Sequence, residues 1–150
     1  MTTQHDVCLS VCTRCRPPDF SGADERRPGY RLAGSILDMT NQIKHHIPRF
    51  TLRGVRCMSQ CKRPCVIALS APSKFTLLFG DLNWRTDAEP VLALAHQYAA
   101  SSDGYVARAQ RPAPLRAGIL GRVPPLHHAG EGIDPDFAFI STPEIHEVAP

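Results

Sequence analysis

The chain of 150 residues contains no long run of apolar residues. Roughly 20 consecutive apolar residues are needed to cross a bilayer as a helix, and no segment approaches that length. The first residues, Met-Thr-Thr-Gln-His-Asp, also lack the basic and apolar regions of a signal peptide. We therefore expect a cytoplasmic protein without membrane contact, in a compartment where thiols stay reduced.

The sequence also lacks the common signatures of an independent catalyst. It contains no glycine-rich phosphate loop, no defensible Ser/His/Asp arrangement and no close carboxylate pair. An apolar fraction of 43% is nevertheless typical of a globular domain with its own core. These features argue against a hydrolase or a transferase, and they favour an electron-transfer or metal-binding protein over an enzyme.

Lysine and arginine are absent from residues 131–150, which contain five acidic residues. The first 130 residues therefore hold all 17 basic residues against nine acidic ones. Such a balance can attract nucleic acid or an acidic protein, or it can simply keep the surface solvated. The basic residues are scattered and are not interleaved with aromatic residues, so we expect no nucleic-acid partner.

Cysteine is confined to two short segments, and the rest of the chain has none. The two segments contain Cys8, Cys12 and Cys15, and then Cys57, Cys61 and Cys65. Thiolates grouped in two loops that a fold can bring together are the ligands that a soft metal or an iron–sulfur cluster requires. The sequence therefore predicts a metal centre between the two segments.

Apolar periodicity predicts the elements that carry these segments. Short alternating or continuous apolar runs predict strands at residues 5–11, 50–55, 66–69 and 75–79. Apolar spacings of three and four predict a helix over residues 29–46. A second helix is expected from an N-cap at Thr86, with Glu89 completing a capping box, to about residue 100. In the first strand, Cys8 points away from the apolar face.

The predicted order of strand, helix, strand, strand, strand, helix (β-α-β-β-β-α) gives an α/β sandwich. We expect residues 1–125 to form one domain that holds the metal site, with a short helix around residues 115–120. Residues 126–150 contain proline, glycine and acidic residues without periodicity. They are expected to form an extended or disordered tail.

The cysteines of the second segment are spaced i, i+4 and i+8 and would share one helix face, but Pro64 disfavours a helix there. A loop with converging thiols fits better. If the first two strands are neighbours, Cys12 and Cys15 lie beside Cys57 and Cys61. Four thiolates satisfy a [2Fe–2S] cluster or a tetrahedral zinc ion. The basic residues among these cysteines can offset the charge of either centre: Arg14, Arg16, Arg56, Lys62 and Arg63.

The motifs at residues 11–16 (Val-Cys-Thr-Arg-Cys-Arg) and 57–69 (Cys-Met-Ser-Gln-Cys-Lys-Arg-Pro-Cys-Val-Ile-Ala-Leu) carry a resemblance to a known family. Together with Phe-Gly-Asp-Leu at 79–82, they resemble predicted metal-binding proteins often encoded near cobalt and cobalamin-biosynthesis genes. The resemblance covers roughly residues 7–125 and implies a metal-handling or electron-transfer role linked to cobalt or corrin metabolism. The strand order is also similar to that of thioredoxin-like [2Fe–2S] ferredoxins.

The ferredoxin resemblance implies a ligand set. Cys57 and Cys61 match the later Cys-x-x-x-Cys pair of those proteins, and Cys12 and Cys15 match the early pair at a shorter spacing. That departure leaves either Cys15 or Cys65 as the fourth ligand. Cys8 has no counterpart in the pattern and is expected to be a core residue.

Three functions follow as hypotheses. The leading one is a small [2Fe–2S] protein that passes electrons to a redox or metal-handling protein partner, with a homodimer suggested by analogy alone. The second is a zinc- or cobalt-binding module that serves structure or metal delivery without redox activity. The third is a thiol–disulfide oxidoreductase that uses the Cys12-x-x-Cys15 motif.

Overall fold

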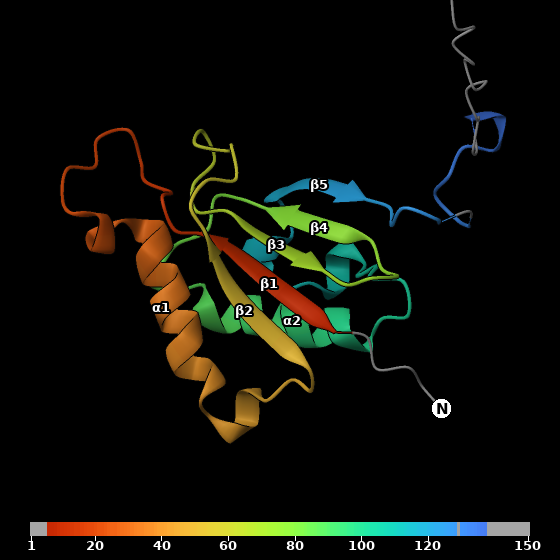
Figure 1. Ribbon diagram of the computed structural model, residues 1–150, viewed down its shortest axis with the longest axis horizontal. Coiled ribbons are helices and arrows are strands. Elements are labelled where there is room, and N and C mark those ends of the chain that lie inside the picture. Colours follow the sequence, from red (N-terminus) through yellow and green to blue (C-terminus); the bar gives the residue numbers. More distant parts are fainter. Residues whose placement is uncertain (1–5, 129, 138–150) are drawn as a thin grey trace, which may run out of the picture.

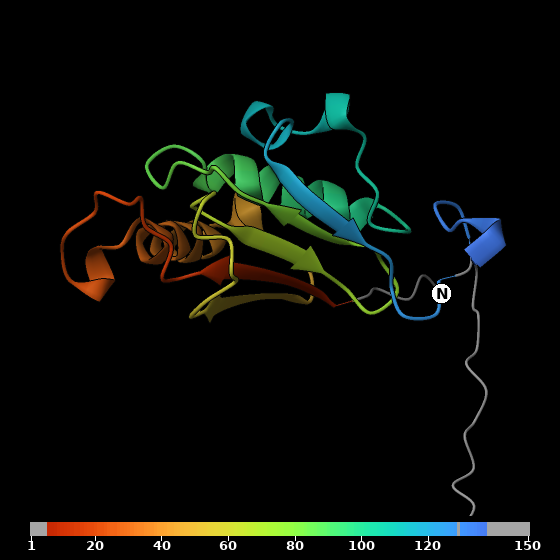
Figure 2. The same ribbon diagram turned by 90° about the horizontal axis from the view of Figure 1, so that it is seen from above.

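A computed structural model describes residues 6–128 and 130–137. Five strands form one sheet in the order β2-β1-β3-β4-β5, and two helices, α1 and α2, lie together on one face of it (Figures 1 and 2). The helices contact each other, and both contact strand β1, which lies between β2 and β3. This α/β sandwich is the predicted fold class.

The first three regular elements form a parallel crossover. Strand β1 (Val7–Cys12) leads through a loop to helix α1 (Pro28–Thr40), and the chain returns as strand β2 (Phe50–Val55). Strands β1 and β2 pair in parallel, with Cys12 opposite Val55. The neighbouring arrangement on which the predicted cysteine site depends is therefore present.

The second half of the sheet is antiparallel. Strands β3 (Ile67–Ser70) and β4 (Thr76–Phe79) form the predicted hairpin, and β3 pairs with the free side of β1. A fifth strand, β5 (Ile119–Val123), pairs antiparallel with β4 at the sheet edge. The predicted helix around residues 115–120 is wrong, because a 3-10 turn (Ala113–Leu115) precedes this strand.

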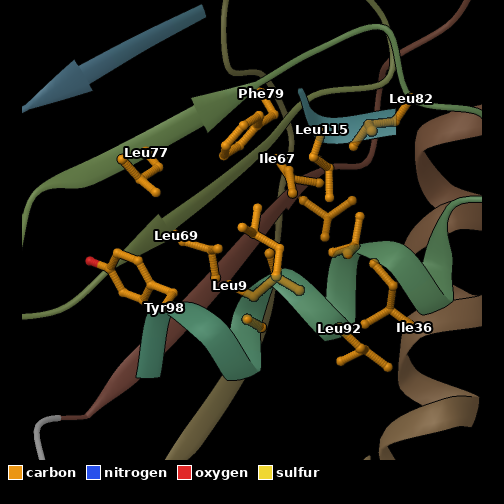
Figure 3. Close-up of a cluster of buried hydrophobic side chains, with 14 of the residues drawn as sticks. Leu9, Ile36, Ile67, Leu69, Leu77, Phe79, Leu82, Leu92, Tyr98 and Leu115 are labelled. Carbon is orange, nitrogen blue, oxygen red and sulfur yellow. The ribbon is translucent and has the colours of Figure 1, made fainter. Parts of the chain in front are cut away.

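Helix α2 (Ala88–Ala100) supplies much of the core. Its apolar face packs against the helix-covered side of the sheet, as the side chains of Leu92 and Tyr98 show in Figure 3. From β1, Leu9 enters the same cluster. Cys8 lies on the opposite face as predicted, but it is only half-buried, so the expectation that it is a core residue is wrong. The alternation in β1 therefore separates one cysteine from the core and leaves Cys12 at the strand's end.

Two predicted helix boundaries differ from the structure. Helix α1 ends at Thr40 and not near residue 46, because the chain turns at Gln42 and leaves Ile43 94% exposed in a 3-10 turn (Ile43–His45). The predicted capping box is also wrong. Asp87 precedes α2, and its carboxylate accepts hydrogen bonds from the Thr86 hydroxyl and the Asn83 amide.

Part of the expected tail is described. His128 packs edge-on against Phe75 with ring centroids 4.8 Å apart, and a 3-10 turn spans Pro135–Phe137. Residues 138–150 lie outside the described residues, and the boundary at residue 125 stays a prediction. Within the described ranges, no helix is long and apolar enough to cross a membrane.

Candidate metal centre

The cysteine segments meet at one end of the sheet. Because β1 and β2 are parallel, their carboxyl ends lie at the same end, and β3 begins there because it runs antiparallel to β1. Thr13 extends the contact beyond the strands, since its amide donates to the Val55 carbonyl at 2.8 Å and its hydroxyl donates to the same oxygen at 3.3 Å. The first cysteine motif is thus held beside the residues that lead into the second.

The first motif is fixed by the start of α1. The Gly29 amide donates to the Cys15 carbonyl at 3.1 Å, and the Cys12 amide donates to the Val66 carbonyl at 3.0 Å. A Cβ at Gly29 would lie 2.0 Å from the Cys12 carbonyl oxygen and 3.0 Å from the Cys15 Cβ. Only glycine permits this approach of helix to loop. In the sequence, the only sign of this contact is a glycine at the start of the predicted helix, 14 residues after Cys15.

The second motif begins in the loop that joins β2 to β3, and two of its three cysteines, Cys57 and Cys61, are exposed. Ser59 has a left-handed backbone with φ of 57°, which places its amide 3.4 Å from the Cys57 sulfur as a donor. An N–H···S hydrogen bond stabilises a thiolate, and bonds of this kind tune the potential of iron–sulfur clusters. The loop therefore presents Cys57 with one polar donor already in place.

Cys65, the third cysteine of this motif, lies in the same loop shortly before β3. It exchanges two backbone hydrogen bonds with Leu82, Cys65 N to Leu82 O at 3.2 Å and Leu82 N to Cys65 O at 3.3 Å. Next to it, the Asp81 amide donates to the Arg63 carbonyl at 2.9 Å. These bonds extend the β3–β4 hairpin beyond its strands and hold Cys65 rigidly against the core.

Burial divides the cysteines into two groups. Cys12, Cys15 and Cys65 are 5%, 3% and 2% exposed, whereas the loop pair faces solvent. Burial, followed by hydrogen bonding and charge repulsion from Cys12, raises the pKa of Cys15 far above its ordinary value. Burial, with smaller effects of Cys12 and Asp87, raises the pKa of Cys65 to about 12. Without a positive centre, the sulfurs of Cys15 and Cys65 are therefore thiols.

The donor set is chemically suited to a soft metal or an iron–sulfur cluster, since it consists of thiols from three adjoining backbone segments. The side chains are not arranged around a common point: among the described residues, no three His, Cys, Asp or Glu side chains form a group that could hold a metal ion. The donors therefore fit such a centre in kind and in topology, and binding would require the exposed loop pair to turn toward the buried thiols.

Two of the basic residues expected around the site already have acidic partners. Arg14 forms an ion pair with Asp24. Arg63 Nε donates to both carboxylate oxygens of Asp81, at 2.9 and 2.7 Å. The Arg63 guanidinium lowers the pKa of Asp81 as a result. Arg16, Arg56 and Lys62 have no ion pair among the described residues, so they supply the less compensated positive charge near the cysteines.

The fold is similar to solved structures of a thioredoxin-like [2Fe–2S] ferredoxin from Aquifex aeolicus. One superposes with a TM-score of 0.52 at 13% identity, over 78% of this chain and 92% of that chain. Two variants of that ferredoxin, each with one cysteine replaced by serine, give TM-scores of 0.51 and 0.50 at 13% and 12% identity. Both comparisons cover 77% of this chain and 98% of the other. In those variants the replaced cysteines are four residues apart. At such identities the similarity shows a shared thioredoxin-like ferredoxin fold.

No curated protein matches the sequence significantly. A family profile does match, and it covers residues 9–125, which include both helices, four strands with most of β1, and five of the six cysteines. The chain therefore belongs to the family described as "Protein of unknown function (DUF1636)".

Proposed function

We propose that this protein binds a [2Fe–2S] cluster at the cysteine-bearing end of the sheet and acts as a one-electron carrier. The observation that carries the proposal is the parallel pairing of β1 with β2, which brings Cys12 and Cys15 next to the loop of Cys57 and Cys61. When bound, such a cluster accepts and donates single electrons. The protein would supply the ligands, partial burial and hydrogen bonds to sulfur.

The solved structures with a similar fold support this choice of cofactor. They share the fold and are described as [2Fe–2S] ferredoxins, and the cysteines changed in their two variants have the spacing of Cys57 and Cys61. The Ser59 amide, which already donates toward the Cys57 sulfur, is the kind of bond that stabilises a ligating thiolate. We assign Cys57 and Cys61 as the solvent-side ligands of the cluster.

The buried side offers Cys12 and either Cys15 or Cys65. Cys15 belongs to the same loop as Cys12, and its thiol is a hydrogen-bonding neighbour of Cys12. Cys65 is fixed by its backbone pairing with Leu82. We assign Cys12 and Cys15 as ligands and Cys65 as the alternative to Cys15. A cluster iron provides the positive charge that offsets the cost of burying a thiolate in this apolar environment.

The same burial argues against thiol–disulfide exchange as the main activity. A thiolate is the attacking species in that reaction, and an oxidoreductase motif lowers the pKa of one cysteine to produce it. The attacking sulfur must also reach a partner disulfide, and Cys12 and Cys15 are only 5% and 3% exposed. Thiols held in this way suit ligation better than nucleophilic attack.

The proposal includes a physiological setting. Reduced cysteines and electron transfer fit a cytoplasmic protein with a redox or metal-handling partner. On the resemblance noted in the sequence, we propose that this partner belongs to cobalt or corrin metabolism. A homodimer belongs to the proposal only as an analogy with the ferredoxin fold.

The test is chemical analysis of the full chain purified without oxygen. We expect iron and acid-labile sulfide in equal amounts, two of each per chain, and visible absorption that bleaches with dithionite. A colourless protein with one zinc ion per chain would instead identify a structural or metal-delivery site. Chain that binds neither iron with sulfide nor zinc, even after anaerobic reconstitution, would contradict a metal centre altogether.

A further inference from the structure

A cavity of about 520 Å³ lies beside the cysteine-bearing end of the sheet, and the proposed cluster does not account for it. Its wall is formed by the loop after β1, the start of α1 and the loop after β4, and it includes Phe20, Arg26, Arg31, Cys65, Trp84 and Arg85. This volume is within the range of sites that bind small molecules. The residue types in the wall indicate which kind of molecule fits.

Two guanidinium groups are held on one aromatic ring. The guanidinium carbons of Arg31 and Arg85 lie 4.6 and 4.5 Å from the centroid of the Trp84 ring. The two carbons are therefore at most about 9 Å apart, which is within the Debye length of about 10 Å at 0.1 M salt. Their positive charges reinforce one another, and contact with the ring limits the freedom of both side chains.

The acidic residue in the wall does not neutralise these charges. Asp81 is engaged by Arg63, which donates to both of its carboxylate oxygens. Arg26, Arg31 and Arg85 form no ion pair with any carboxylate that the structure describes. The first turn of α1, which also lines the cavity, contains no acidic residue and no side-chain cap. The cavity therefore has an excess of positive charge with no described counter-ion.

The rest of the wall is largely apolar. Phe20, Leu82 and the Trp84 ring face the same space as the arginines, together with three prolines. A bare inorganic anion would leave this surface without a partner, whereas a molecule with an apolar body would cover it. The arrangement suits acidic groups at the arginines and hydrocarbon against the aromatic rings.

We propose that this cavity binds a small organic molecule with two anionic groups, carboxylate or phosphate, on an apolar body; “dianion” refers below to the two anionic groups and not to the net charge. Arg31 and Arg85 bind the acidic groups by charge-assisted hydrogen bonds, and Trp84 packs against the body. Because Trp84 already orders both guanidinium groups, little side-chain entropy is lost on binding. Because the buried Cys65 is part of the wall, such a ligand would lie next to one of the three buried cysteines.

The chain offers a direct readout, because Trp84 is its single tryptophan. Tryptophan fluorescence of the full chain would be followed during titration with suberate and with 1,6-hexanediol bisphosphate, which both contain six methylene groups, at constant ionic strength. These two compounds separate carboxylate from phosphate on one hydrocarbon spacer. We expect a saturable change with at least one of them. Inorganic phosphate, which lacks the body, and 1,6-hexanediol, which lacks the charge, are expected to bind at least about tenfold more weakly.

Substitutions assign the binding to the arginines. Arg31→Gln and Arg85→Gln should each weaken the dianion by about tenfold or more. Arg108→Gln is the matched control: it removes the same charge from an exposed 3-10 turn beyond the other end of α2, and should change the affinity less than twofold. No saturable response to either dianion, equal binding of the diol, or equal losses in all three variants would overturn the proposal.

The result is independent of the iron–sulfur proposal. Iron and sulfide would be measured in the same samples, and Trp84 reports binding whether or not a cluster is present. Saturable binding to iron-free chain with the expected arginine dependence would support the dianion site while the cluster fails. Iron-loaded chain with no dianion response would reject the dianion site and leave the cluster intact.

Discussion

Gly29 and Cys12 are in direct backbone contact: a Cβ on Gly29 would lie 2.0 Å from the Cys12 carbonyl oxygen. This contact joins the start of α1 to the end of β1, at the place where the first cysteine motif begins. Backbone cannot rotate away as a flexible side chain can, so any larger residue must displace the helix or the loop. The position of the buried cysteines therefore depends on a residue without a side chain.

Gly29→Ala should destabilise the protein and disturb the cysteine site together. We expect a loss of about 1–3 kcal/mol in the free energy of unfolding, typical of overpacking in a rigid environment. Bound iron should fall in the same variant. Gly34→Ala is the control, because it lies in the same helix with nothing within 4 Å of the added Cβ. It should be neutral or stabilise by up to about 1 kcal/mol. Urea denaturation and iron analysis test both variants, and equal stability of the two would contradict the contact.

Single Cys→Ser variants should map the ligands. Replacing Cys57, Cys61, Cys12 or Cys15 is expected to abolish or strongly reduce bound iron and sulfide, because each change removes one thiolate of four. Cys8→Ser should keep the wild-type content, since this residue is in mid-strand on the face away from the helices. Iron loss in Cys65→Ser but not in Cys15→Ser would reassign the fourth ligand to Cys65. Retention of iron in all the variants would contradict a thiolate-bound cluster.

Tyr98→Phe should cost about 1–2 kcal/mol, because the buried Tyr98 hydroxyl donates to the Phe75 carbonyl at 2.7 Å. The substitution leaves the ring in the core and removes only the donor, so a buried carbonyl loses a partner. Tyr105→Phe is the matched control at a side chain that is 50% exposed, and should change stability by less than about 0.5 kcal/mol. Thermal and urea unfolding of the two variants measure the difference. Equal effects would show that the buried hydrogen bond makes no net contribution to the free energy of unfolding.

Asp103 should make stability depend on acid pH. The Tyr105 amide donates to its carboxylate at 2.8 Å and the Ser101 hydroxyl lies 3.1 Å from the same oxygen, and these bonds lower the pKa of Asp103 below its ordinary 3.8. A lowered folded-state pKa means that the contribution is fully present above the unfolded value and is lost as pH falls through the folded value.

Urea midpoints of wild type and Asp103→Asn would be compared from pH 6 to pH 2.5. The wild type should be the more stable at pH 6, and the difference should shrink below about pH 3.8 as the carboxylate becomes protonated in the unfolded and then in the folded chain. Asp38→Asn, which makes the same charge change on α1, is the control. A gap between wild type and Asp103→Asn that stays constant over this range would contradict the assignment.

Much of the architecture could be predicted because it rests on local pattern. The alternation of Val7, Leu9 and Val11 identified β1 and its buried face, and all three side chains are at most 1% exposed. The apolar positions of α2 were equally clear. Strand β5 was missed because it is a short edge strand whose residues are exposed or half-buried, so it carries no strong apolar period. Its existence depends on pairing with β4, which is a long-range contact.

The end of α1 shows the limit of the same reasoning. Ile43 continues the apolar spacing of the helix, yet it is exposed because the chain turns after Thr40 to reach β2. The arginines around Trp84 were missed for a related reason. Arg31 and Arg85 are 54 residues apart in the sequence and meet only because α1 packs beside the loop that leads into α2.

The sequence by itself determined which kind of chemistry to propose: six cysteines in two short segments favour thiolate ligation. Only the tertiary structure decided how those thiols differ. Packing of α1 and the β3–β4 hairpin buries Cys12, Cys15 and Cys65 and raises the pKa of the latter two, while the loop after β2 leaves Cys57 and Cys61 in water. Burial and charge depend on every element that surrounds a side chain, and residue spacing alone does not contain that information.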